Sequence, residues 1–155
     1  MSQSTHNEPI AVREGEGLDI EQLNKYLKGK IPAWQGELQL SQFPSGYSNL
    51  TYMLKAGNKE YVLRRPPFGA NIKSAHDMKR EFDMLAAIKS AYKKVPNPII
   101  YCGNESIIGA EFYLMERVNG LILRQKPPKN ISLTSEVMLG LSTALIDNLV
   151  EIHQI

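Results

Sequence analysis

Residues 42–65, QFPSGYSNLTYMLKAGNKEYVLRR, read as three short strands and their connections. Pro44 and Gly46 interrupt a first strand, and the residues that follow alternate between apolar and polar as those of a half-buried strand do. Small, turn-forming residues at 56–59 separate this second strand from a third, which ends at Arg64. We therefore predict successive strands joined by a glycine-containing turn and then by a hairpin.

The turn and the third strand together could bind an anion. Gly46, Ser48 and Asn49 offer backbone N–H groups and small side-chain donors. Val62 and Arg64 share one face of the third strand, because successive side chains alternate, so the arginine could reach the same anion. A nucleotide phosphate is the natural candidate. The alternative is an ordinary turn followed by a solvated strand end at Arg64 and Arg65, and these residues alone favour that alternative.

The composition is that of a globular protein with unevenly placed charge. The 155 residues carry a formal net charge of +2, which is too small to argue for nucleic acid as a partner. The segment Lys59–Lys94 is basic, with nine lysines or arginines against four acidic residues. The single cysteine, Cys102, excludes an internal disulfide and fits a reducing cytoplasm. No apolar run is long enough for a membrane span. We expect a cytoplasmic, non-membrane protein with one domain or one lobe.

Periodicity and chain-breaking residues predict further elements on both sides of the opening segment. In chain order they are a flexible arm at 1–17, a helix at about 19–29, the first strand at 37–43, a helix capped at Ser74 and running to about Ala91, strands at 99–102 and 111–116, and a long helix at 134–153. This order predicts five strands, with one helix crossing over between the third and the fourth.

Glu81 has an unusual place in the second predicted helix. It lies three residues after Met78, which belongs to the apolar stripe, so its carboxylate lies on or beside the buried face. An unpaired charge there is strongly disfavoured, and Arg64 is the partner that we predict. The alternative places Glu81 at the solvent edge, in weak interactions with Asp77 and Arg80.

Six segments in order resemble the aminoglycoside phosphotransferase family, in particular its branch of phosphotransferase-like domains fused to acyl-CoA dehydrogenases. They are FPSGYSNLTY, EYVLRRPP, AHDMKREFDML, VPNPIIYC, FYLMERVNG and LIDNLVEIH. The resemblance covers about Leu38 to His153 and implies an α+β fold, the small lobe of a protein-kinase-like structure with a five-stranded antiparallel sheet. It implies a small lobe at 18–118, a hinge and connector at 119–133, and the first long helix of a second lobe at 134–155.

The resemblance implies nucleotide binding by the turn, the third strand and the helix. Gly46, Ser48 and Asn49 match the turn that covers the phosphates, although a full GxGxxG is lacking. Arg64 stands where the family has the lysine that holds the α- and β-phosphates, and Glu81 matches the carboxylate that orients it. Arginine keeps the cation but replaces a point charge by a planar fork. The implied cofactor is ATP or GTP with Mg²⁺.

A hinge for the nucleotide base is also implied by the resemblance. Met115, Glu116, Arg117 and Val118 match its positions. The backbone C=O of Glu116 and the backbone groups of Val118 would bond the base, and Val62 would form part of the apolar roof above it. Side-chain identity at the hinge therefore carries little information.

The catalytic residues of the family have no counterpart in this sequence. Its H-x-D-x-x-x-x-N loop is missing, since none of His6, His76 and His153 is followed by x-Asp. The later acidic metal ligand is missing as well. We therefore expect a lobe truncated before the catalytic loop and inactive alone. Its parent enzyme would transfer the γ-phosphoryl group to a hydroxyl of a small molecule.

Two other functions stay open. One is a non-catalytic nucleotide-binding or regulatory module that self-associates through the long helix if its apolar stripe is uncovered. That stripe consists of Val137, Leu141, Leu145 and Leu149. The other is an RNA-binding module with a basic surface, whose binding would depend strongly on salt. Its cations would be Lys79, Arg80, Lys93 and Lys94.

Overall fold

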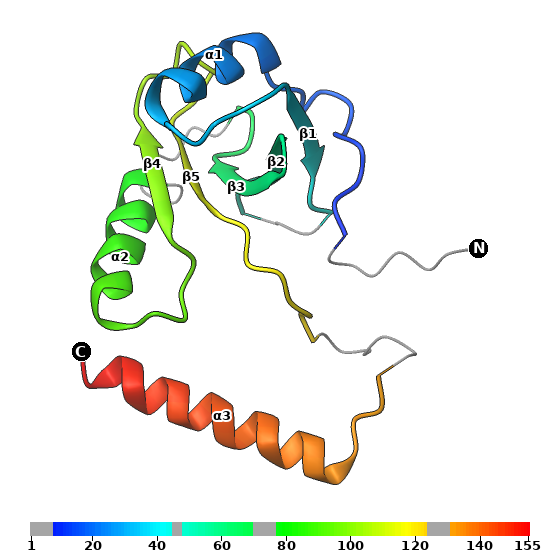
Figure 1. Cartoon of the computed structure of the whole chain (residues 1–155), viewed down its shortest axis with the longest axis vertical. Helices are drawn as coiled ribbons and strands as arrows, with labels where there is room; N and C mark the ends of the chain where they lie inside the picture. Colours follow the sequence, from blue (N-terminus) through cyan, green and yellow to red (C-terminus); the bar gives the residue numbers. More distant parts are fainter. Residues whose placement is uncertain (1–7, 45–47, 70–76, 124–130) are drawn as a thin grey trace.

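A computed structural model describes residues 8–44, 48–69, 77–123 and 131–155. This part of the chain forms a five-stranded antiparallel sheet with three helices, as the sequence predicts (Figure 1). The elements are α1 (Ile20–Lys30), β1 (Leu38–Gln42), β2 (Leu50–Ala56), β3 (Lys59–Arg65), α2 (Met78–Ala91), β4 (Pro98–Cys102), β5 (Phe112–Glu116) and α3 (Ser135–His153).

The strands follow the order β1-β2-β3-β5-β4, so β3 lies at the centre of the sheet. α2 follows β3 and precedes β4, which is the predicted crossover. The register of β3 and β5 places Val62 opposite Met115 and Arg64 opposite Tyr113. Residues directly opposite each other in an antiparallel pair point to the same face. These four side chains therefore share one face of the sheet.

The other face carries the hydrophobic core, which α1 covers. Leu23 and Leu27 lie one helical turn apart and are fully buried. Asp19 caps the helix by accepting a backbone N–H of the first turn at 2.9 Å. Trp34 stacks on Tyr61, with 5.2 Å between the ring centroids. The sheet contributes Leu38, Leu50, Tyr52, Leu54, Tyr61, Leu63, Phe112 and Leu114 to this core.

Residues 8–17 are attached to the sheet, which corrects the expectation of a flexible arm. Ile10 exchanges backbone hydrogen bonds of 2.8 and 2.9 Å with Gln42, and the Tyr52 hydroxyl donates to the backbone oxygen of Glu16 at 2.8 Å. The side chain of Gln42 also donates to the Glu16 carboxylate, which lowers the pKa of Glu16. The polar composition of this segment predicted a flexible arm, because composition alone does not reveal hydrogen bonds to residues far away in the sequence.

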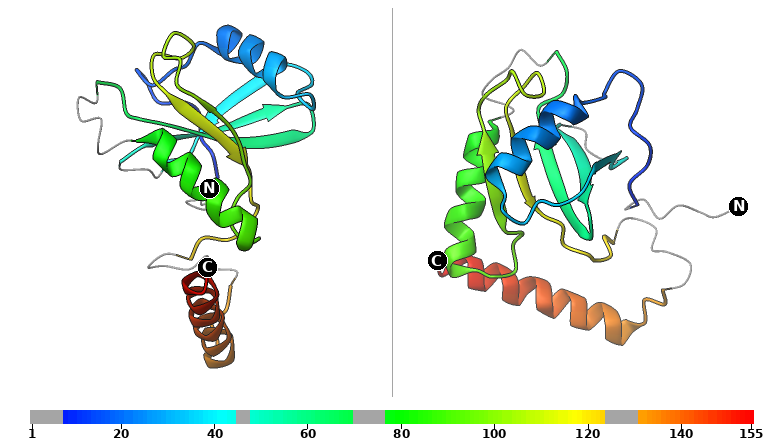
Figure 2. Two further views of the ribbon diagram at one scale, coloured as in Figure 1. Left: turned by 90° about the vertical axis from the view of Figure 1, so that its left-hand side faces the viewer. Right: turned by 45° about the horizontal axis from the view of Figure 1, so that its top comes forward.

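α2 begins later than the sequence predicts. Ser74 lies outside the described residues, and its assignment as the helix cap is wrong because Asp77 occupies that place and accepts the N–H of Arg80 at 2.8 Å. Phe82 packs on Tyr113, with 6.3 Å between the ring centroids. Tyr113 belongs to the face that points away from the core, so α2 and α1 lie on opposite faces of the sheet (Figure 2).

α3 is a long helix below the sheet, and none of its residues is buried (Figure 1). It touches the rest of the described chain through polar groups. Lys94 pairs with Glu151 at 2.9 Å, and Tyr92 donates to Asn148. The apolar stripe is uncovered, with exposures of 43, 43, 62 and 48% at Val137, Leu141, Leu145 and Leu149. No helix in the described ranges has the length and the apolar content needed to cross a bilayer.

Candidate functional site

Three apolar side chains form a row across the sheet face that points away from α1. Met53 on β2 lies opposite Val62, which in turn lies opposite Met115 on β5. Val62 is buried, and the two methionines are partly exposed. The structure thus brings together Val62 and Met115, as the roof and hinge assignments require. Their contact with a base stays a prediction.

Arg64 and Glu81 form the predicted ion pair beside this row. Arg64 Nε lies 3.4 Å from Glu81 Oε2, and the two side chains are 33 and 35% exposed. The solvent-edge alternative for Glu81 does not hold, because its carboxylate bonds to Asn49 and Tyr113 and pairs with Arg64 rather than with residues of its own helix. Arg64 Nε is itself buried and makes no hydrogen bond within the described ranges. The ion pair therefore exists without a well-formed hydrogen bond at this atom.

Two neutral side chains hold the Glu81 carboxylate. Asn49 Nδ2 donates to Oε1 at 2.9 Å, and the Tyr113 hydroxyl donates to Oε2 at 3.0 Å. Burial raises the pKa of Tyr113, Arg64 opposes that rise, and the nearby Glu81 charge adds to it. The phenol therefore stays protonated and can act as a donor. The sequence did not single out Tyr113, because an aromatic residue in a strand is expected simply to pack.

The three residues predicted to form a phosphate-binding turn differ in what the structure shows of them. Asn49 is buried, at 4% exposure, and its amide is directed to Glu81. Ser48 is exposed beside it, and Gly46 lies outside the described residues. The structure thus gives Asn49 a role in orienting Glu81, and phosphate binding by this turn stays a prediction.

The hinge residues follow the end of β5. The backbone N–H of Glu116 donates to Asn97 at 2.9 Å, and its carboxylate lies 3.6 Å from Lys89 Nζ. Val118 is 61% exposed. Glu116 is therefore fixed to the connection before β4 and to α2, whereas Val118 lies open at the surface.

Arg117 reaches back from the hinge over the apolar row. Its Nη1 donates to Glu60 Oε2 and contacts Met53 Sδ, both at 2.7 Å. Sequence reasoning placed Arg117 in the hinge but gave its side chain no role. A signal existed, because Glu60 alternates with Val62 and Arg64 and therefore points to the same face.

Arg65 is buried, whereas the side chain of its neighbour Arg64 is partly exposed. Arg65 is 2% exposed, so the expectation of a solvated strand end is wrong for this residue. Its Nη1 donates to the backbone oxygen of Ile108 at 2.9 Å, and the guanidinium lies 3.8 Å from the ring centroid of Phe68. Burial lowers the pKa of Arg65. The residue anchors the β4–β5 connection from the core side.

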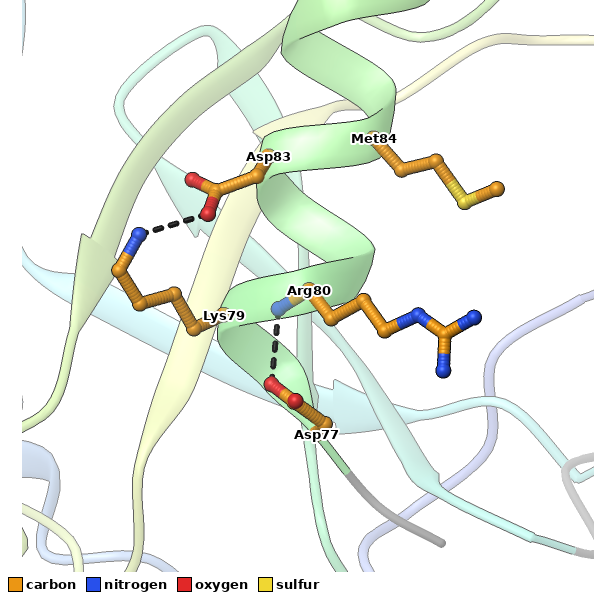
Figure 3. Close-up of a pocket in the computed structure, with 5 residues that line it drawn as sticks. All are labelled: Asp77, Lys79, Arg80, Asp83 and Met84. Atoms are coloured by element: carbon orange, nitrogen blue, oxygen red, sulfur yellow. Dashed lines mark hydrogen bonds and ion pairs between the residues drawn. The ribbon is translucent and has the colours of Figure 1, made fainter. Parts of the chain in front are cut away.

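A surface hollow of about 460 Å³ lies on α2. Figure 3 shows its lining: Asp77, Lys79, Arg80, Asp83 and Met84. Lys79 pairs with Asp83 at 2.6 Å, and Asp77 caps the helix. The charges of Lys79 and Asp83 therefore neutralise each other, whereas the exposed side chain of Arg80 points away from both aspartates. Lys94 of the proposed RNA surface is likewise paired with Glu151.

The described residues contain no cluster of three or more histidine, cysteine, aspartate or glutamate side chains suited to a metal ion. Comparison with known proteins shows which kind of domain this arrangement belongs to. The model of the phosphotransferase enzyme family matches residues 39–155. This chain belongs to that family.

Curated relatives of this phosphotransferase domain are acyl-CoA dehydrogenase family members. Member 11 of Rattus norvegicus is 34% identical over 159 residues, which is 100% of this chain and 20% of that protein. Member 11 of Homo sapiens is 35% identical over 133 residues, 86% of this chain and 17% of that protein. Member 10 of Mus musculus is 36% identical over 145 residues, 93% of this chain and 13% of that protein. The domain therefore spans a fifth or less of these relatives.

A solved structure shares the fold of the phosphotransferase domain. It is described as a putative aminoglycoside phosphotransferase of Ralstonia eutropha, with a TM-score of 0.60 and 28% identity. The match covers 75% of this chain and 32% of the solved chain. The kinase-like α+β fold and the family resemblance predicted from the sequence are thus confirmed.

Proposed function

We propose that this chain is the nucleotide-binding lobe of a phosphotransferase that uses ATP or GTP with Mg²⁺ and acts on a hydroxyl of a small molecule. The observation that carries the proposal is the Arg64–Glu81 pair, 3.4 Å apart, beside the apolar row of Met53, Val62 and Met115. An apolar surface next to a cation suits a ligand with a flat base at one end and phosphates at the other.

The residues fit such a ligand in charge and in position. Arg64 is one-third exposed, so a phosphate can approach its guanidinium, and arginine forms strong hydrogen bonds with phosphate oxygens. Glu81 is fixed by Asn49 and Tyr113, so it can orient Arg64 without being displaced. The backbone beyond Met115 would bond the edge of the base. A nucleotide would bring the phosphoryl group to be transferred, and Mg²⁺ would need carboxylates from outside the described residues.

Titration with a fluorescent ATP analogue and Mg²⁺ tests the proposal directly. Arg64→Met removes charge-assisted hydrogen bonds worth about 1.5–3 kcal/mol, so the dissociation constant should rise roughly tenfold to hundredfold. Arg80→Met removes an exposed arginine at the hollow on α2 and should change little. Absence of saturable binding by the unmodified chain, or an equal effect of both substitutions, would contradict this function.

A second candidate is a non-catalytic module that associates with another copy of itself. The uncovered apolar stripe of α3 favours it, because contiguous exposed apolar surface of this kind marks a contact site. The two candidates are compatible in one molecule, since the stripe belongs to α3 and the apolar row to the sheet. They are separated by measuring nucleotide affinity and molecular mass independently.

A further inference from the structure

Two side chains from neighbouring strands lie close to Glu81 Oε2. The Tyr113 hydroxyl donates to it at 3.0 Å, whereas Arg64 Nε lies 3.4 Å away and makes no hydrogen bond within the described ranges. Arg64 and Tyr113 lie directly opposite each other on β3 and β5, so both approach the carboxylate from the same face of the sheet. They therefore share one acceptor atom.

The orientation of the carboxylate is set by neutral donors. Asn49 fixes Oε1 from the residue that precedes β2, and Tyr113 fixes Oε2 from β5. Arg64 thus meets a carboxylate that already accepts two hydrogen bonds. A buried N–H without an acceptor is costly, and here the carboxylate is not free to turn toward it because its two oxygens are held.

We propose that Tyr113 is a positioning residue for Arg64: by holding Glu81 Oε2 it keeps the Arg64–Glu81 pair at ion-pair distance but short of a full hydrogen bond. The guanidinium is then held in place without a hydrogen bond from its buried Nε to Glu81, and its charge stays available to an anionic ligand through the one-third of the side chain that is exposed. The identity of that anion as a nucleotide phosphate rests on the proposed function, whereas the relation between the three residues does not.

A thermodynamic cycle in two backgrounds tests the proposal without any ligand. The coupling between Arg64→Met and Glu81→Gln is measured by urea unfolding, first in the unmodified chain and then in the Tyr113→Phe background. If the hydroxyl holds the pair apart, its removal should raise the coupling at least fivefold, about 1 kcal/mol. A merely structural role would lower stability without raising that coupling. Equal or smaller coupling in the Tyr113→Phe background overturns the proposal.

Tyr101→Phe is the matched control. Tyr101 is the β4 neighbour of Tyr113, and its hydroxyl donates to a different carboxylate, Glu111 Oε2, at 2.6 Å. Its substitution also removes one tyrosine–glutamate hydrogen bond near α2, but it leaves Glu81 untouched. The Arg64–Glu81 coupling should stay within twofold of its original value. A rise equal to that caused by Tyr113→Phe would overturn the specific role of Tyr113.

Proton NMR of the Arg64 Nε–H gives a second readout, and its first measurement, on the unmodified chain, needs no Tyr113 variant. The signal is assigned by its loss in Arg64→Lys. It should appear at the position of a guanidinium that lacks a hydrogen bond, and should move downfield in Tyr113→Phe. A downfield, strongly bonded signal in the unmodified chain overturns the proposal, even if Tyr113→Phe fails to fold.

Inorganic triphosphate separates this inference from the proposed function. Tyr113→Phe should weaken its binding about threefold to tenfold, because a fully bonded Glu81 neutralises more of the Arg64 charge. If the unmodified chain binds neither triphosphate nor ATP, the proposed function fails. The unfolding cycle and the NMR signal then still decide the role of Tyr113.

Discussion

Glu60 and Arg117 join the start of β3 to the residue after β5 through an ion pair of 2.7 Å. The same Arg117 atom touches Met53, so the guanidinium lies at one end of the apolar row formed by Met53, Val62 and Met115. The pair is only partly exposed, at 19 and 31% for the arginine and the glutamate. Its electrostatic contribution should therefore exceed that of a pair in open solvent.

Glu60→Gln should lower the free energy of unfolding by about 1 kcal/mol, because it leaves the half-buried Arg117 cation without its acid. For a chain of this size that corresponds to a fall in Tm of about 2–4 °C. Differential scanning calorimetry measures it. Asp83→Asn is the control, since the Lys79–Asp83 pair is mostly exposed and should contribute under about 0.5 kcal/mol. An equal fall in Tm in the two variants would show that the Glu60–Arg117 pair stabilises the fold no more than an exposed pair does.

Arg65→Ala should destabilise the chain far more than Arg64→Ala does. The first substitution removes a buried side chain from Phe68 and leaves the backbone oxygen of Ile108 without its donor. We expect a cost of about 2–3 kcal/mol for it and under about 1 kcal/mol for Arg64, which is one-third exposed. Urea unfolding of both variants checks the contrast. A cost for Arg64 that matches the cost for Arg65 would contradict it.

High pH should destabilise the fold through its buried tyrosines. Burial raises the pKa of Tyr52 and of Tyr101 to about 12, above the ordinary value of 10.0. Between pH 10 and 12 the unfolded chain releases these protons while the folded chain keeps them, so stability that is fully present below pH 10 is lost as the pH rises to 12. The ultraviolet absorbance of phenolate follows the ionisation. The same titration in urea should show both tyrosines ionising near pH 10, and identical curves in the two solvents would refute the shift.

The apolar stripe of α3 should drive association at raised protein concentration. Leu145→Glu places a charge in the middle of the stripe and should return the chain to a monomer in sedimentation velocity experiments. Gly140→Glu adds the same charge on the side of the helix that carries Asp147, where a side chain meets nothing within 4 Å, and should leave association unchanged. If the unmodified chain is a monomer at all concentrations, the self-association candidate is excluded. If both variants associate alike, the contact lies elsewhere.

Much of the fold could be predicted from local patterns. Alternation placed β2 and β3 and the hairpin between them, and helical spacing placed α1 and α3 to within about a residue of their observed ends. The position of Glu81 beside an apolar stripe was enough to predict its pairing with Arg64. These predictions were correct for the same reason: the spacing of apolar residues along a helix or strand indicates which of its faces is buried.

The remaining contacts join residues far apart in the sequence through polar groups, and no local pattern records them. Residues 8–17 looked like an arm, but hydrogen bonds to Gln42 and Tyr52 hold them. Asp77, and not the predicted Ser74, caps α2, and because serine and aspartate are both good capping residues the local sequence did not decide between them. Tyr113 was missed because its hydroxyl matters only once Glu81 lies next to it.

Arg64 and Arg65 are chemically identical neighbours with different surroundings. One points to the face that carries Glu81, and the other points into the protein beneath Ile108. The two side chains do not differ, so the face to which each one points is set by the pairing of β3 with β2 and β5. A slip of that pairing by one residue would bury the first arginine and expose the second. The hairpin turn at Gly57, with its positive φ of 62°, sets that pairing, so a substitution there could exchange the two arginines without altering either of them.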